Sequence, residues 1–132
     1  MIVSIEKQTD GSYIAYNKDC DGFTAIGTGD TPQEAKEDFL NSIEEIKELY
    51  LEKGDAIPEG LDSLPVFQFD LSSFFEYYPF INVTAFARSV GINDSLMRQY
   101  KHGGTYISDA QLNKIQQKIY NIGADFQALR LI

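Results

Sequence analysis

Basic and amide side chains gather around one glycine in the second half of the chain. Gly91 has apolar residues on both sides and the small residue Ala87 four positions before it. This spacing is typical of a helix-turn-helix, in which two short helices cross closely at a sharp turn. Asn93 is a good N-cap for the second helix, which we expect to end near Lys101.

The side chains that this second helix would turn outward suit contacts with DNA. Arg98 and Gln99 can read the edges of guanine and adenine, respectively. Hydroxyl and basic groups nearby suit phosphates. The predicted DNA-binding residues are Thr84, Arg88, Asn93, Ser95, Arg98, Gln99, Lys101 and His102. Helix pairs of this kind also occur as plain packing, so the spacing alone leaves that alternative open.

The charge around this helix pair is modestly positive. Residues 82–118 contain 5 Lys or Arg and 2 Asp side chains, a net charge of +3. Because affinity for DNA grows with the number of neutralised phosphates, one such unit would bind weakly. We therefore expect the unit to act in duplicate.

The last segment of the chain offers a means of duplication. Ser108 and Gln111 form a capping-box pattern that predicts the start of a helix. Apolar residues then recur at coiled-coil spacing, at Leu112, Ile115, Ile119, Ile122, Phe126 and Leu129. One interpretation is that this stripe covers the helix pair, and another is that it joins two chains. We expect the early part to pack inward and the later part to pair. The predicted dimerisation residues are Ile115, Ile119, Ile122 and Phe126, in a homodimer or higher homo-oligomer that would present two helices to a palindromic site.

The aspartates of the first half and Cys20 are the candidates for a catalytic site, but their sequence surroundings do not favour catalysis. Four aspartates of the first half could in principle collect a divalent metal, as in nucleases of the ribonuclease H type. They are Asp10, Asp19, Asp21 and Asp30. Each lies beside glycine or in a turn, where Asp is common for local backbone reasons. Cys20 has no histidine in its own half to act as a base. We expect no enzyme activity, no metal and no cofactor. The alternative that these aspartates leave open is a metal-dependent nuclease.

The first half reads as a small sheet with one long helix. Strands are expected at residues 2–7, 13–16 and 23–26, with Gly27 and Gly29 ending the third. Asp10-Gly11 predicts a hairpin turn of type I′. Thr31, Pro32 and Glu34 predict a helix start, and an apolar stripe runs from Ala35 to Tyr50.

The fold class expected from these patterns is α+β. Residues 66–69 read as a fourth strand that rejoins the first sheet, because three strands bury little on one helix. A linker rich in Pro, Gly and Asp lies at about residues 54–65. We expect an acidic domain at 1–70, with a small antiparallel sheet and one long helix, followed by an all-α helix-turn-helix domain at 71–132.

Composition separates the two halves by charge. The chain has 132 residues and a net charge of −9, which as a global figure disfavours nucleic acid. Residues 1–65 hold 15 acidic and 5 basic side chains, whereas residues 66–132 hold 5 and 6. The single cysteine excludes an intrachain disulfide, and no apolar run approaches the ~18 residues of a membrane span. We expect a cytoplasmic protein with no membrane partner.

Together, the two halves resemble the HicB family of antitoxins. In the first half the resemblance lies in residues 5–7, 10–16 (Asp-Gly-Ser-Tyr-Ile-Ala-Tyr) and 22–35, followed by an acidic helix. In the second half it lies in residues 82–88 and 91–93, and in Gly103 before Ser108. It implies a truncated, noncatalytic domain similar to ribonuclease H, followed by a helix-turn-helix.

The resemblance also implies a function. Members of this family bind a small basic toxin, an RNA-cleaving endoribonuclease, through the N-terminal domain, and bind operator DNA of their own operon through the C-terminal module. The predicted toxin-binding residues are Tyr16, Asp19, Asp21 and Phe23, near the turn between two strands. The alternative is a solitary helix-turn-helix transcriptional regulator without a toxin partner.

Overall fold

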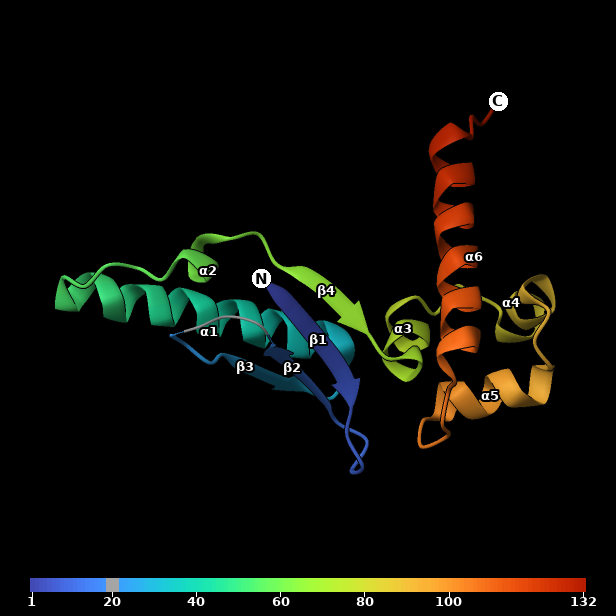
Figure 1. Ribbon diagram of the computed structural model, residues 1–132, viewed down its shortest axis with the longest axis horizontal. Helices are drawn as coiled ribbons and strands as arrows, with labels where there is room; N and C mark the ends of the chain where they lie inside the picture. Colours follow the sequence, from blue (N-terminus) through green and yellow to red (C-terminus); the bar gives the residue numbers. More distant parts are fainter. Residues whose placement is uncertain (19–21) are drawn as a thin grey trace. The chain divides into compact units, whose positions relative to one another are not determined.

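The computed structural model describes residues 1–18 and 22–132. Its fold is α+β, with one sheet and several helices (Figure 1). Strands are β1 (Ile2–Lys7), β2 (Tyr13–Asn17), β3 (Ile26–Gly29) and β4 (Val66–Phe69). Helices are α1 (Pro32–Lys53), α2 (Glu59–Asp62), α3 (Leu71–Tyr77), α4 (Val83–Val90), α5 (Asp94–His102) and α6 (Asp109–Ala128). The chain divides into two compact units, Met1–Pro79 and Phe80–Ile132.

The sheet of the first unit is mixed, and the expectation of an antiparallel sheet is wrong. Its strand order is β3-β2-β1-β4. The pairs β1–β2 and β2–β3 are antiparallel, but β4 pairs with β1 in parallel, with Ile2 opposite Val66 and Ile5 opposite Phe69. The fourth strand therefore rejoins the sheet as predicted. The strand β4 runs parallel to β1, and not antiparallel as expected, because α1 carries the chain back to the end of the sheet where β1 starts.

The hairpin between β1 and β2 forms, but its turn is not of type I′. Among the described residues only glycines have positive φ, so Asp10 is not in the left-handed region and Gly11 (φ 87°) is. The Gly11 N–H donates to the Gln8 carbonyl at 3.0 Å, and the Gln8 N–H donates to the Ser12 carbonyl at 2.7 Å. This pattern is typical of a hairpin loop longer than two residues, in which a type I turn is followed by one glycine in the left-handed conformation.

The third strand lies later than predicted, at Ile26–Gly29 instead of 23–26. The Asn17 side chain binds the earlier segment, accepting from Ala25 N at 2.8 Å and donating to the Phe23 carbonyl at 3.2 Å. Gly27 does not end the strand but lies within it. A Cβ at Gly27 would meet the backbone of Phe39 on α1, 2.6 Å from its Cα, so glycine permits the helix to approach the sheet closely.

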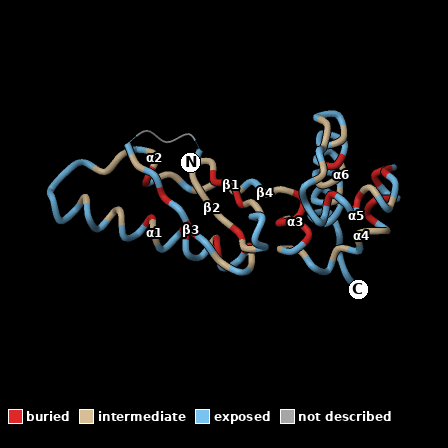
Figure 2. The backbone as a smooth tube through the Cα atoms, turned by 90° about the horizontal axis from the view of Figure 1, so that it is seen from below, coloured by how far each residue is buried: buried red, intermediate tan, exposed pale blue. Residues whose placement is uncertain are grey.

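Helix α1 forms as the sequence predicts and covers one face of the sheet (Figure 1). Thr31 accepts from Glu34 N at 3.1 Å, and Gly54 ends the helix in the left-handed conformation with φ 71°. The core buries Val3 and Ile5 of β1 against Ala35, Phe39 and Ile43 of α1. Towards its C-terminus α1 becomes exposed (Figure 2).

Two short helices that the sequence patterns did not predict complete this unit. Leu61 of α2 is buried in the core, so part of the expected linker is folded. Asp70 accepts from Lys7 N at 2.9 Å and from Ser73 N at 2.7 Å, which joins the end of β1 to the start of α3. Lys36 of α1 donates to the Tyr77 hydroxyl at 3.2 Å. The first unit therefore ends at Pro79 and not at residue 70, because these bonds hold α3 to α1 and β1.

The second unit, Phe80–Ile132, contains α4, α5 and α6. Helix α4 packs against both α5 and α6. Phe86, Ala87 and Val90 of α4 are buried, as are Met97 and Tyr100 of α5. On α6 the buried residue is Ile115, so this long helix contributes to the core of the unit mainly through one turn.

Candidate functional site

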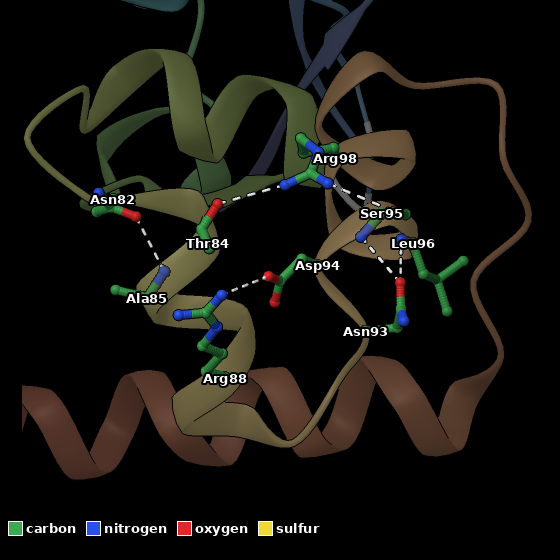
Figure 3. Close-up of polar contacts among 9 residues, drawn as sticks. All are labelled: Asn82, Thr84, Ala85, Arg88, Asn93, Asp94, Ser95, Leu96 and Arg98. Atoms are coloured by element: carbon green, nitrogen blue, oxygen red, sulfur yellow. Dashed lines mark hydrogen bonds and ion pairs between the residues drawn. The ribbon is translucent and has the colours of Figure 1, made fainter.

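A three-residue connection joins α4 to α5 and fixes the crossing of these helices. Gly91 ends α4 in the left-handed conformation, with φ 81° and its N–H directed to Ala87 and Arg88 carbonyls. Asn93 then caps α5 by accepting from Ser95 N at 2.9 Å and Leu96 N at 3.4 Å (Figure 3). The fully buried Ala87 leaves room for the two helices to approach. These local features are those that the sequence predicted.

Arg98, the residue predicted to read bases, is held by hydroxyl groups on both helices. Its guanidinium donates to Thr84 Oγ1 of α4 at 3.3 Å and to Ser95 Oγ of α5 at 3.4 Å (Figure 3). Asn82 caps α4 by accepting from Ala85 N at 2.9 Å. The N-terminal turns of α4 and α5 thus lie on either side of an exposed arginine, and the positive ends of both helix dipoles favour an anion beside it.

A second arginine crosses between the two helices. Arg88 of α4 pairs with Asp94 of α5, with 3.2 Å between Nη2 and Oδ2 (Figure 3). The Arg88 side chain is 74% exposed and that of Asp94 is 27% exposed. Arg88 therefore remains accessible, but a carboxylate neutralises part of its charge. The sequence analysis did not predict this pair, although Asp94 at the first position of α5 was the available signal.

The other predicted DNA-binding residues are exposed and lie on α5 or at its N-cap. Gln99, Lys101 and His102 are exposed, as are Asn93 and Ser95. On the inner side of α5, Met97 is fully buried and Leu96 is half-buried.

Lys114 of α6, which was not in the predicted set, donates to the Gly91 carbonyl at 3.4 Å. It thereby ties α6 to the connection between α4 and α5.

The predicted dimerisation residues of α6 separate into two groups. Ile115 is only 1% exposed, so it is occupied within its own chain and does not offer a surface to another. Ile119 and Ile122 are half-buried, and Phe126 is 64% exposed. Leu129 is also exposed. The later part of the apolar stripe is therefore the accessible part.

Of the predicted toxin-binding residues, the structure describes Tyr16 and Phe23. Asp19 and Asp21 lie outside the described residues. Phe23 is half-buried against the core of the first unit. Tyr16 alternates along β2 with the core residue Ala15, so it lies on the sheet face opposite α1. The Phe23 side chain thus packs against the core, whereas the Tyr16 side chain lies on the other face of the sheet.

Tyr16 lies in a small polar cluster on that face. Its hydroxyl donates to Glu6 Oε1 at 2.8 Å, and Lys18 Nζ is 5.8 Å from the centre of its ring. The hydrogen bond to the Glu6 carboxylate, helped by burial and by the carboxylate charge, raises the pKa of Tyr16 above its ordinary value. Tyr16 is therefore a neutral hydrogen-bonded phenol at physiological pH.

Among residues 1–18 and 22–132, no group of three or more His, Cys, Asp or Glu side chains is arranged to hold a metal ion. Asp10, a candidate from the sequence, instead accepts from Ser12 N at 2.9 Å and Ser12 Oγ at 2.6 Å. The Ser12 hydroxyl and N–H lower the pKa of Asp10. Within the same described part of the chain, none of the helices has the length and apolar character that crossing a membrane requires.

Comparisons with protein-family models, with curated proteins and with solved structures find no match for this chain.

Proposed function

We propose that this chain is the antitoxin of a type II toxin–antitoxin system. In this proposal Met1–Pro79, a partial ribonuclease H-like domain without catalysis, binds and masks a small basic RNA-cleaving toxin. The second unit is a helix-turn-helix domain that binds operator DNA and represses the operon of the chain itself. The protein acts in the cytoplasm as a homodimer or higher homo-oligomer.

The observation that carries the proposal is the arrangement around Arg98. Thr84 and Ser95 hold the guanidinium at the junction of two helix N-termini, and Gln99 is exposed beside it. A preoriented guanidinium with an amide neighbour suits bidentate contacts to base edges in a major groove. In this role α5 is the recognition helix, while Thr84, Arg88, Lys101 and His102 contact phosphates.

The charge of the first unit supports a basic protein partner. Residues 1–65 carry a net charge of −10, whereas residues 82–118 carry +3. Opposite charge accelerates encounter with a basic RNA-binding protein, and a surface of this sign competes with RNA for it. The same surface repels the DNA backbone, so the two units are suited to different ligands.

The experiment that tests the proposal is purification of the tagged chain from its source cells, with mass spectrometry of what accompanies it. We expect a small basic protein in stoichiometric amount, whose separate expression stops growth and whose effect the chain reverses. A lone oligomer that still shifts its own upstream DNA would contradict the antitoxin role and favour a solitary transcriptional regulator.

A second assay addresses catalysis by the chain itself. We expect the purified chain to leave RNA intact with magnesium or manganese. Metal-dependent cleavage that disappears in Asp10→Asn would overturn the noncatalytic assignment and favour a nuclease.

A further inference from the structure

The two outer edges of the sheet in the first unit differ in how their backbone groups are satisfied. At the β3 edge, side chains of α1 take the place of a neighbouring strand. The Thr28 N–H donates to Asp38 Oδ2 at 2.8 Å, and the Ile26 carbonyl accepts from Ser42 Oγ at 2.9 Å. The following Asp30 N–H donates to Glu34 Oε2 at 2.7 Å. The β3 edge is thereby closed to further strand pairing.

The β4 edge has no such cover. The N–H groups of Val66 and Asp70 donate to the carbonyls of Met1 and Ile5, so the even-numbered residues of β4 face β1. Backbone groups alternate in direction along a strand, which turns those of Phe67 and Phe69 to the outer side. Among the described residues, none hydrogen-bonds to these outward groups. Lys36 Nζ lies over the Phe67 ring, 4.5 Å from its centre.

The composition of β4 distinguishes it from the rest of the first unit. The strand reads Val-Phe-Gln-Phe and holds no charge, although it belongs to the first unit, which includes the acidic residues 1–65. Val66 is 62% exposed, and Leu64 just before the strand is 88% exposed. An uncharged, aromatic edge strand with exposed apolar neighbours lacks the charged side chains by which proteins usually prevent edge pairing.

We propose that β4 pairs antiparallel with β4 of a second copy of this chain, which joins the two sheets into one. The outward groups of Phe67 and Phe69 fix the register. A two-fold axis at Gln68 sets Phe67 opposite Phe69 of the second copy, and each such pair exchanges both of its N–H···O bonds. Gln68 then lies opposite Gln68 of the second copy, in a closely spaced pair without mutual hydrogen bonds.

A second copy fits this edge because the edge is self-complementary. The same register satisfies the outward backbone groups of both strands, and it pairs aromatic with aromatic side chains across the interface, which stabilises antiparallel strands. The neutral strand also brings no like charges into direct opposition, despite the acidity of the unit as a whole. This contact is independent of α6, so it can coexist with pairing through Phe126.

A cross-linking experiment tests the register. The full chain carrying Cys20→Ser and Gln68→Cys is oxidised gently, and covalent dimers are measured on a non-reducing gel. Closely spaced antiparallel pairs have Cα–Cα distances of about 4.5 Å, within the range that disulfides span. Thr28→Cys in the same background is the matched control, because Thr28 lies on the same sheet face of the closed β3 edge. We expect efficient dimers from Gln68→Cys and few from Thr28→Cys.

Equal cross-linking of the two variants, or none from Gln68→Cys, would overturn the proposal. Light scattering gives a second measurement that does not depend on cysteine. The Phe126→Asp change removes pairing through α6, and we expect the chain that carries it to form dimers. Adding Gln68→Lys should convert these dimers to monomers. Adding Thr28→Lys should leave the dimers intact. Circular dichroism verifies that each variant is folded. Monomers in the Phe126→Asp background alone, at the concentration used for cross-linking, would also contradict pairing through β4.

Discussion

At the scale of single residues, the candidate DNA-binding site depends on which partners hold its two arginines. Arg98 is positioned by neutral hydroxyl groups, which leave its charge available to a ligand. Arg88 is positioned by the Asp94 carboxylate, which offsets its charge. The two arginines should therefore respond differently when their partners are changed.

Arg98→Ala should abolish the gel shift of the DNA just upstream of the gene for this chain. Loss of a bidentate base contact costs about 2 kcal/mol, or roughly thirtyfold in affinity. Arg130→Ala is the control, because Arg130 is an exposed arginine whose guanidinium donates to the adjacent Leu129 carbonyl. An unchanged shift with Arg98→Ala would remove Arg98 from the recognition role.

Asp94→Asn should strengthen DNA binding. The change frees Arg88 from its ion pair and removes a negative charge close to the expected phosphates. We expect an affinity gain of several-fold at low salt, since exposed ion pairs are worth at most about 1 kcal/mol. Titration by fluorescence anisotropy at two salt concentrations measures it, and weaker binding would show that the pair orients Arg88 productively.

Tyr16 provides a pH-dependent prediction. Its pKa is raised in the folded state, so its hydrogen bond to Glu6 contributes stability below the ordinary tyrosine pKa and loses it as pH rises through the folded value. Glu6→Gln should move the Tyr16 pKa down toward about 10, the ordinary tyrosine value. Carbon NMR of the tyrosine ring follows this titration. A Tyr16 pKa unchanged by Glu6→Gln would contradict the assigned cause.

At the scale of secondary-structure elements, the close approach of α1 to β3 decides where the third strand runs. Gly27 provides the space, and Asp38 and Ser42 of α1 then satisfy the outer edge of the strand. The glycine is therefore part of the packing and not a strand terminator.

Gly27→Ala should destabilise the first unit by about 2 kcal/mol or more, because the added methyl group meets backbone atoms of Ala35 and Phe39 that cannot move independently. Gly123→Ala is the matched control. Gly123 lies within α6 with nothing within 4 Å of an added Cβ, so alanine there should stabilise by about 0.5–1 kcal/mol. Urea denaturation measures both changes, and a neutral Gly27→Ala would contradict the close approach.

At the scale of the whole molecule, the long helix α6 of the second unit has a buried part and an exposed apolar part. Ile115 is buried in the core of the unit, whereas α6 continues beyond it with apolar residues that are half-buried and then exposed, among them Phe126. An exposed apolar stripe of this kind is typical of a surface that pairs.

Phe126→Asp should halve the particle mass measured by light scattering, because a charge at the centre of the accessible stripe cannot be buried between two chains. Ala124→Asp is the control, since it adds the same charge to the opposite side of α6, also at an exposed position. Equal masses for Phe126→Asp and the unchanged chain would place the pairing surface elsewhere.

Local signals allowed much of this protein to be predicted from sequence alone. Thr31 and Asn93 accept from the N–H groups that a cap must satisfy, and Gly54 and Gly91 end their helices in the left-handed conformation. The bounds of β1 and β4 also agree with prediction, at Ile2–Lys7 and Val66–Phe69. The caps depend on residues within a few positions of one another, so the sequence by itself determined them. The two strands were predicted from their residue types, but they form by pairing with each other, with Ile2 opposite Val66.

Tertiary contacts decided the rest. The parallel direction of β4 depends on the return path of α1, and the position of β3 depends on contact between Gly27 and Phe39. The partners of Arg88 and Arg98 likewise come from the crossing of two helices. These outcomes join residues separated along the chain, and short-range periodicity holds no information about which distant groups the packed core brings together.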